Sequence, residues 1–355
     1  MILAHNILVN AVQFKCIPLP FNTPLPDWDK LEIMEHSNEI APAFLDRVKR
    51  KIQYTLFRQK WNIGITKHSV TEVSGLEGLA KQRRSLTNLI WMEERKDAFF
   101  ADPFLMQSVE NKESVLLFYE YFCWQIKKGR IDSVTFANGR YGKPSIALET
   151  GHHLSYPFIF PRDLERRILP EHSASKNLSF YKIDGQGVAC GKNTIGDYLE
   201  LIDPTIVFWQ SRYWMFATQL GKYENRDLHI YFADNINGPW KMHKNNPVKQ
   251  DYSNSRPAGQ FIFYNKSLFR PAQDCTANYG AAININKIIR LTETEFLEEP
   301  VCEVRPEFGS RYDYGMHTIS SFGSYTALDG ARCESVIHHS LDRYGRYFRT
   351  RAKND

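Results

Sequence analysis

Several signals that would assign this chain to a membrane or to a secreted class are missing. It has no run of about 18 apolar residues, the length that a membrane-spanning helix needs. Its N-terminus lacks the basic segment and the clean cleavage site of a secretion signal. The six cysteines are scattered and form no Cys-x-x-Cys pair, which argues against a zinc knuckle or a dense disulfide framework and fits a reducing compartment. We therefore expect a cytoplasmic protein without a membrane span.

Signals for nucleotide and nucleic-acid binding are also missing. No glycine-rich phosphate loop occurs. The net charge of +5 is spread over the chain, and basic residues do not alternate with aromatic residues along any stripe. No long low-complexity segment occurs, and 43% of the residues are hydrophobic, which is enough for a sizeable core. We expect a globular protein that does not bind nucleic acid.

The first 60 residues differ from the rest of the chain in the spacing of their apolar residues. Apolar residues recur there every three or four positions, at Leu45, Val48, Ile52 and Leu56. This spacing predicts one amphipathic helix. From Trp61 onward, short aromatic and β-branched runs are broken by Gly, Asn and Asp, which is typical of β-hairpins. We predict an N-terminal extension over 1–60, a β domain over 61–335 and a C-terminal tail over 336–355.

One short motif recurs through the β region. It consists of a polar or aromatic residue, a proline and an apolar run, and it is centred on Pro103, Pro157, Pro204 and Pro257. The gaps between these prolines are 54, 47 and 53 residues, and a less regular fifth member contains His317. Repeats of about 50 residues indicate radial repetition of a four-stranded unit. The predicted fold is all-β, a five-bladed β-propeller with an N-terminal helical extension.

The residue before each proline is expected to be extended, because proline disfavours the helical region at the preceding position. Proline lacks an N–H group and is tolerated only at a strand start or edge. We therefore expect the preceding residues to begin the innermost strands and to surround one central pocket. These residues are Asp102, Tyr156, Asp203 and Arg256.

Carboxylates from different blades could supply the acid and the base that cleavage of a glycosidic bond requires. Asp102 is the predicted base, and Asp203 would raise the pKa of the acid through like-charge proximity. Glu171 is the preferred acid and Asp274 is its competitor. The alternatives are that the Asp-Pro pairs only start turns, that Glu171 lies in a surface loop, and that Asp274 pairs with Arg270 or caps a turn.

Six residues are predicted to bind the polar groups of a sugar: His153, Tyr156, Arg256, Arg270, Gln273 and His317. A guanidinium can pair with a carboxylate, a phosphate or vicinal hydroxyls, but it can equally form a structural ion pair with the carboxylates of the pocket. A lone histidine is often a structural donor. No cofactor is expected. No spacing requires a metal, although a structural divalent cation in the central channel is compatible with the histidines and carboxylates there.

Several segments, taken in chain order, resemble a known family. They include WNIGI, FFADPFL, HLSYPFIF, DPT, YWMFAT, ADNINGPW, SRPAGQ and LTETEF, between about Trp61 and Arg332. Together they resemble the N-terminal domain of plant glucosamine inositolphosphorylceramide transferases, a domain that is itself similar to the five-bladed propellers of the arabinanase, levansucrase and invertase superfamily. The resemblance implies that Asp102 corresponds to the base or nucleophile and Asp203 to the aspartate that tunes the acid. The Glu-Gly-Pro or Glu-Cys-Pro context of the superfamily's acid is absent.

The leading hypothesis is a carbohydrate-active enzyme that breaks or transfers a glycosidic bond. One alternative is a non-catalytic glycan-binding module in polysaccharide or glycolipid assembly. Another is a glycosyltransferase that requires a nucleotide-sugar donor. In the plant proteins a separate transferase domain lies downstream, so the family name alone does not establish transferase activity here. In each case the expected partner is a glycan or a sugar-containing substrate.

Overall fold

The computed structural model describes residues 57–335, except 110, 112, 161–164 and 198. The amphipathic helix predicted around 45–56 and the tail predicted over 336–355 lie outside these residues. Residues Trp61–Ala331 form one compact unit, which contains the candidate site. The predicted domain boundaries and the helical extension therefore stay predictions.

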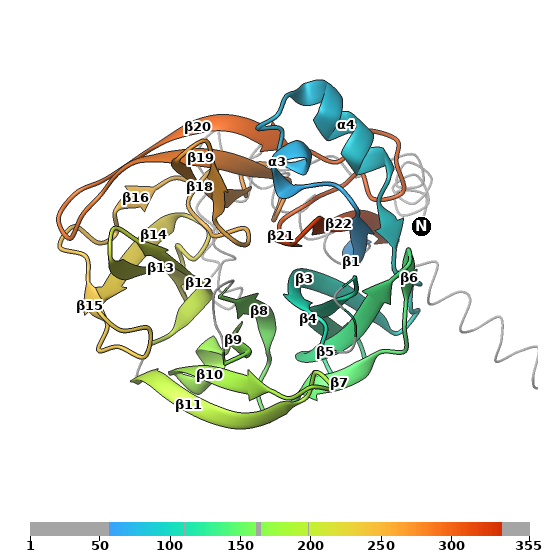
Figure 1. Ribbon diagram of the computed structural model, residues 1–355, viewed down its shortest axis with the longest axis horizontal. Helices are drawn as coiled ribbons and strands as arrows, with labels where there is room; N and C mark the ends of the chain where they lie inside the picture. Colours follow the sequence, from blue (N-terminus) through green and yellow to red (C-terminus); the bar gives the residue numbers. More distant parts are fainter. Residues whose placement is uncertain (1–56, 110, 112, 161–164, 198, 336–355) are drawn as a thin grey trace, which may run out of the picture. The chain divides into compact units, whose positions relative to one another are not determined.

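Five antiparallel sheets are arranged radially around a central axis (Figure 1), which confirms the predicted β-propeller. The first blade contains β3 (Ala98–Gln107), β4 (Val115–Cys123), β5 (Lys128–Ala137), β6 (Arg140–Tyr141) and β7 (Ser145–Leu148). The second contains β8 (Ser155–Ile159), β9 (Arg167–Glu171), β10 (Asn177–Ile183) and β11 (Ala189–Asp197), and a short 3-10 helix, η2 (Ser173–Ser175), follows β9. The third contains β12 (Leu201–Trp209), β13 (Arg212–Gln219), β14 (Asp227–Ala233), β15 (Lys241–Met242) and β16 (Lys249–Gln250). The fourth contains β17 (Ile262–Tyr264), β18 (Ser267–Asp274), β19 (Ala282–Leu291) and β20 (Phe296–Val304).

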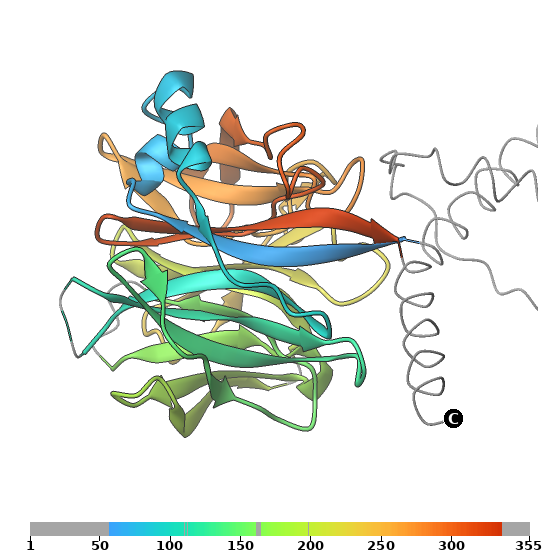
Figure 2. The same cartoon turned by 90° about the vertical axis from the view of Figure 1, so that its right-hand side faces the viewer.

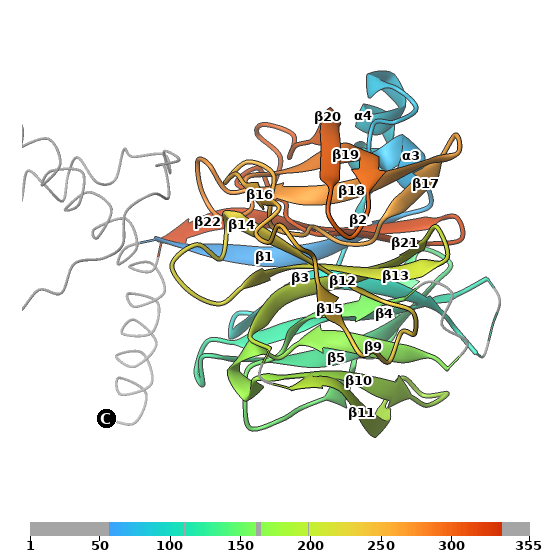
Figure 3. The same ribbon diagram turned by 90° about the vertical axis from the view of Figure 1, so that its left-hand side faces the viewer.

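The fifth blade combines strands from distant parts of the sequence. It contains β2 (Ile90–Trp91), β1 (Phe57–Thr66), β22 (Tyr325–Ser335) and β21 (Ile319–Phe322). The side views show β1 and β22 next to each other (Figures 2 and 3). Pairing an early strand with a late one closes the ring, so the first and last blades do not leave an open gap between them.

Two short helices lie between β1 and β2, namely α3 (Val70–Val73) and α4 (Leu79–Thr87). Ser69 and Glu72 form a capping box that starts α3. Val73 is fully buried and packs in a cluster with Ile262 and Val304 from the fourth blade. The helices thus cover apolar side chains of the propeller and do not line the site.

The proline motif produces the same backbone irregularity in three blades. Asp102, Tyr156 and Asp203 have positive φ angles of 55°, 43° and 51°. At each of them two residues, the named one and its proline, face one residue of the neighbouring strand, which is a β-bulge. The expectation that these residues are extended is therefore wrong. The reason is that the bulge removes the proline, which has no N–H group, from the hydrogen-bonded ladder.

The state of the cysteines and the length of the helices bear on the expectation of a cytoplasmic protein without a membrane span. Cys123, Cys190, Cys275 and Cys302 carry free thiols, whereas Cys333 is disulfide-bonded. A disulfide runs against the expectation of a reducing compartment, so the cytoplasmic location stays a prediction. Within the described ranges, no helix is long and apolar enough to cross a membrane.

Candidate functional site

A cavity of about 230 Å³ is lined by residues of several blades, among them residues of β1, β3, β4, β8 and β9. We call it the central cavity. Its walls are Trp61, Phe99, Ala101, Asp102, Glu120, Phe122, His153, Ser155, Glu171, Arg256, Tyr279 and His317. Five of the ten predicted site residues are among them: Asp102, His153, Glu171, Arg256 and His317. Residues up to 256 positions apart in the sequence thus share one small space. Of the four pre-proline residues expected to surround it, Asp102 and Arg256 line the cavity, whereas Tyr156 and Asp203 do not.

Asp102 is held by hydrogen bonds to both of its carboxylate oxygens. The Thr318 hydroxyl donates to Oδ1 at 2.8 Å, and the backbone N–H of Tyr156 donates to Oδ2 at 3.2 Å. Burial raises the pKa of Asp102 to about 6, although the neighbouring His317 opposes the shift. Asp102 is therefore positioned firmly, and it changes charge close to neutral pH.

Glu171 lies at the end of β9, where its carboxyl group is also hydrogen-bonded at both oxygens. The hydroxyl of Ser155 donates to Oε2 at 2.9 Å, and that of Ser173 donates to Oε1 at 2.8 Å. Burial raises the pKa of Glu171, and Arg256 opposes the shift. Glu171 is thus a buried member of the cavity wall, and the alternative of a surface-loop glutamate does not describe its position.

Asp203 lies behind the central cavity and pairs with Arg256, which lines it. The Arg256 Nε–H donates to Asp203 Oδ2 at 2.6 Å, and Gln273 Nε2 donates to the same oxygen at 3.0 Å. Arg256 Nη1 also donates to Asn225, and the guanidinium lies 4.9 Å from the ring centroid of Tyr279. Burial raises the pKa of Asp203, and the adjacent Arg256 opposes that shift. Gln273 is fully buried and supports Asp203 without lining the cavity.

Three other predicted residues have internal partners and do not line the cavity. The Tyr156 hydroxyl shares a hydrogen bond with Thr205 and accepts one from the backbone of Gly259. Arg270 is 1% exposed and donates twice to Glu298, at 2.6 and 2.8 Å, in a buried bidentate ion pair. Asp274 accepts from the backbone and hydroxyl of Thr276, so it caps a turn. These contacts support structural roles for all three.

His317 lies between two carboxylates. Its Nδ1 is 2.6 Å from Asp329 Oδ2, and its Nε2 is 3.5 Å from Asp102 Oδ1. Burial lowers the pKa of His317, but the negative charges of Asp329 and Asp102 outweigh burial, so the net shift is upward. Sequence reasoning missed Asp329, although an aspartate within the apolar run TALDGA is a recognisable signal of a buried charge.

The same three residues could in principle approach a divalent cation. One ligand atom from each of Asp102, His317 and Asp329 lies within 4.8 Å of the others. However, Asp329 Oδ1 already accepts the backbone N–H groups of His317 and Thr318, and Oδ2 accepts that of Asp102. These internal bonds satisfy the carboxylate without a metal, so we do not assign the three as ligands.

Glu120 is a cavity residue that sequence reasoning missed. It lies on β4, in register with Ala101 of β3, and it is 5% exposed. Its Oε1 lies 3.5 Å from His153 Nε2. Burial raises the pKa of Glu120 well above its ordinary value, and the charges of Asp102 and Glu171 add to the shift. The signal in the sequence is a single glutamate inside the apolar strand VLLFYEYF.

Aromatic rings form much of the remaining wall. Trp61 packs on His317 with ring centroids 4.1 Å apart, and Tyr279 meets the same histidine edge-on at 5.2 Å. Phe99 and Phe122 are stacked at 4.7 Å. A cavity with apolar aromatic walls and a few fixed polar groups is the usual form of a small-molecule site.

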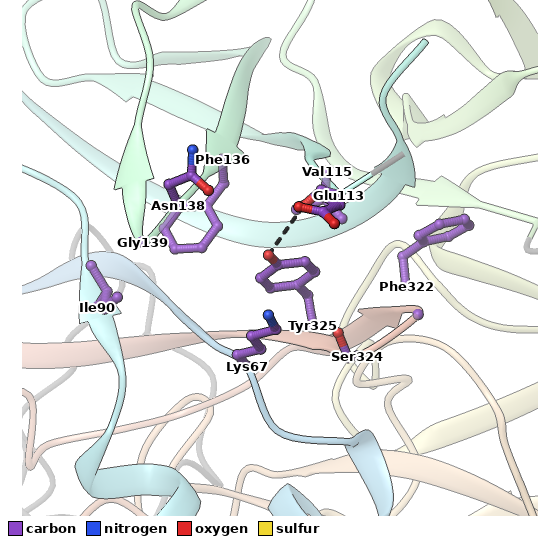
Figure 4. A pocket seen from close by; sticks show the side chains of 11 residues that line it. Lys67, Ile90, Glu113, Val115, Phe136, Asn138, Gly139, Phe322, Ser324 and Tyr325 are labelled. Atoms are coloured by element: carbon purple, nitrogen blue, oxygen red, sulfur yellow. Dashed lines mark hydrogen bonds between the residues drawn. The ribbon is translucent and has the colours of Figure 1, made fainter. Parts of the chain in front are cut away.

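A second, larger pocket of about 440 Å³ has different chemistry (Figure 4). It lies toward the opposite end of β3, since Val115, which pairs with Gln107, lines it. Its charged lining residues are Lys67 and Glu113, both exposed, and the Tyr325 hydroxyl donates to the backbone carbonyl of Glu113. Because it has no group of buried carboxyls, we assign the candidate site to the smaller central cavity.

Comparisons with known proteins gave both sequence and structural matches. The family model described as glucosamine inositolphosphorylceramide transferase 1, N-terminal, matches residues 89–311. Glucosamine inositolphosphorylceramide transferase 1 of Oryza sativa subsp. japonica is 32% identical over 253 residues, which cover 67% of this chain and 34% of that protein. The Arabidopsis thaliana protein of the same name is 31% identical over 210 residues, which cover 57% and 27%. The chain thus matches between about a quarter and a third of the length of these relatives. Among solved structures, an exo-β-1,3-galactanase from Clostridium thermocellum matches with a TM-score of 0.46 and 9% identity, over 60% of this chain and 53% of that one.

Proposed function

This chain belongs to the glucosamine inositolphosphorylceramide transferase 1 N-terminal family, and on that premise we propose that its propeller is a carbohydrate-active domain that cleaves or transfers a glycosidic bond in the central cavity. One observation carries the proposal: three buried carboxyl groups, Asp102, Glu120 and Glu171, line a single cavity with aromatic walls. Glycosidic-bond chemistry requires an ionised carboxylate and a protonated carboxyl group on either side of the bond. The cavity, at about 230 Å³, is below the usual range of roughly 300–1,000 Å³ for ligand pockets. This size favours one sugar ring over an oligosaccharide.

Asp102 is the proposed base. Its two hydrogen-bond donors and the adjacent His317 favour its ionised form, and its pKa of about 6 leaves it charged at neutral pH. Asp102 would take the proton of an incoming hydroxyl group as that oxygen bonds to the anomeric carbon. If the hydroxyl belongs to water the reaction is hydrolysis, and if it belongs to an acceptor sugar the reaction is transfer.

Asp203 is proposed to tune the site without contacting the sugar. Its negative charge raises the pKa of Glu120, and its hydrogen bond to Arg256 fixes the guanidinium in the cavity wall. Arg256 and His317 are the proposed partners of sugar hydroxyl groups. Arg270, Gln273 and Asp274 have no role in this proposal, because their side chains are used inside the fourth blade or behind Asp203.

A substitution of the base tests this function. Asp102→Asn should lower the kcat measured on a panel of aryl glycosides and natural glycans by about 10²–10⁴-fold, because a general base contributes that much. Glu299→Gln, on the exposed edge of the fourth blade, is the matched control and should retain full activity. Normal turnover by a folded Asp102→Asn protein would reject the assignment.

The second candidate is glycan binding without turnover. It is favoured by the fact that Asp102, Glu171 and Asp203 all accept hydrogen bonds from the protein itself, as groups of a rigid binding site would. The transferase name belongs to relatives about three times as long as the matched segment. Binding on a glycan panel without turnover would support this candidate. Turnover that requires a nucleotide sugar would instead support a glycosyltransferase.

A further inference from the structure

Glu120 differs from the other carboxyl groups of the central cavity in its hydrogen bonding. Asp102 and Glu171 each accept two hydrogen bonds from the protein. Glu120 accepts none from any residue that the structure describes, although its side chain is 7% exposed and lines the cavity. A buried carboxylate without donors is costly, whereas the same group in its protonated form is tolerated and can itself donate.

The neighbour of Glu120 is a histidine whose tautomer is fixed by the backbone. The N–H of Gly129 donates to His153 Nδ1 at 2.9 Å, so a neutral ring carries its proton on Nε2, the atom that faces Glu120 at 3.5 Å. Burial lowers the pKa of His153, which keeps the ring neutral. A neutral histidine supplies no positive charge that would hold Glu120 in its ionised form.

This arrangement depends on a glycine. A Cβ atom added at Gly129 would lie 2.5 Å from Glu120 Oε1 and 2.7 Å from His153 Cε1. It would also lie 2.5 Å from the backbone carbonyl oxygen of Leu154, so any other residue at position 129 would displace these two side chains and the backbone beside them. β5 can thus pass close to both side chains because Gly129 has no Cβ atom.

We propose that Glu120 is the proton donor of the reaction in the central cavity and that His153 is its positioning residue. This inference rests on the proposed function and replaces Glu171 in the role of acid. Burial together with the charges of Asp102, Glu171 and Asp203 raises the pKa of Glu120 well above its ordinary value, which favours the protonated form and supports the assignment. In the reaction, the Glu120 proton moves to the glycosidic oxygen as its bond to the anomeric carbon breaks, and the leaving alcohol departs neutral. Glu120 becomes a carboxylate while Asp102 gains the proton of the incoming hydroxyl, so one proton has been given and one taken.

The test compares Glu120→Gln with Glu171→Gln on two kinds of substrate. The probes are phenyl and 2,4-dinitrophenyl glycosides of galactose, glucose, N-acetylglucosamine and arabinose, assayed with the full chain. A proton donor matters only when the leaving group is poor, so Glu120→Gln should lose about 10²–10⁴-fold in kcat/KM on phenyl glycosides and less than about 10-fold on dinitrophenyl glycosides. Glu171→Gln should affect both kinds equally. His153→Ala should shift the alkaline limb of the pH profile, which a purely structural role would leave in place.

The outcomes separate this inference from the proposed function. Turnover by the unmodified protein together with normal phenyl-glycoside activity of Glu120→Gln would overturn the role of Glu120 alone. If Glu171→Gln, and not Glu120→Gln, shows the dependence on the leaving group, Glu171 is the proton donor and the proposed role of Glu120 is overturned as well. Absence of turnover by the unmodified protein would overturn the proposed function, and the role of Glu120 with it.

Discussion

The ion pair between Arg256 and Asp203 supports the site, and replacing Arg256 by methionine tests it. Methionine keeps an unbranched apolar chain but removes the donors to Asp203 and Asn225. Asp203 is 2% exposed and would retain the hydrogen bond from Gln273. Removing one partner of a buried ion pair costs about 3–5 kcal/mol, because the remaining charge is left uncompensated. We expect a loss of this size in the free energy of unfolding at pH 7.5, measured by urea denaturation.

The loss should depend on pH. In Arg256→Met the pKa of Asp203, already raised by burial, rises further because the opposing cation is gone. A carboxyl group whose folded-state pKa lies above its unfolded value contributes stability below the unfolded pKa and loses it as pH rises through the folded pKa. The defect of Arg256→Met should therefore be smaller at pH 5 than at pH 7.5.

Two further variants test whether the loss of stability in Arg256→Met comes from the uncompensated charge of Asp203. Arg256→Met combined with Asp203→Asn removes both charges and should recover most of the lost stability. Arg290→Met breaks an exposed ion pair with Glu295 and should cost less than about 1 kcal/mol. If Arg256→Met costs no more than Arg290→Met, or if Asp203→Asn restores nothing, the reasoning about the buried charge is refuted.

Three other outcomes are expected. The kcat/KM should fall about tenfold per pH unit below about pH 6, since Asp102 must be ionised to act as a base, and a pH-independent rate between 4 and 7 would contradict that role. Gly129→Ala should destabilise the protein by about 1–3 kcal/mol and lower turnover, because its Cβ would collide with Glu120 Oε1 and with the backbone carbonyl oxygen of Leu154. Gly142→Ala, which meets no atom closer than 3.4 Å, should do neither, and equal effects of the two substitutions would argue against this packing. Glu298→Gln should lower the free energy of unfolding in urea by about 3–5 kcal/mol, because it breaks the buried ion pair with Arg270, and it should leave sugar affinity unchanged. A loss of sugar affinity at constant stability would instead place Arg270 in the site.

The sequence predicted the fold and part of the site because the repeated motif is local. Pro103, Pro157 and Pro204 each mark the same bulge, and Asp102, which precedes the first of them, lines the central cavity. The backbone at those positions could not be predicted from proline alone, because a bulge depends on the partner strand. Glu120 was missed since it lies on the second strand of its blade, where the motif gives no marker.

The sequence contains two Arg-Pro-Ala triplets, which begin at Arg256 and Arg270, and they show how little a local pattern can predict. Arg256 lines the central cavity, whereas Arg270, in the same local context, turns into the fourth blade and binds Glu298. The difference comes from β20, which supplies the glutamate and whose position follows from strand order. The sequence contains both Arg270 and Glu298, but it does not show that the fold brings them into contact. The aromatic wall likewise joins Trp61 and Tyr279, which only ring closure brings together.

The central claim, that the central cavity holds a sugar beside Glu120 and Asp102, is tested most directly by a crystal structure of the Glu120→Gln protein soaked with mixed mono- and oligosaccharides. We predict density for a sugar ring between Trp61 and Phe122, with its glycosidic oxygen next to residue 120. A sugar bound only elsewhere, with the central cavity filled by water, would contradict it.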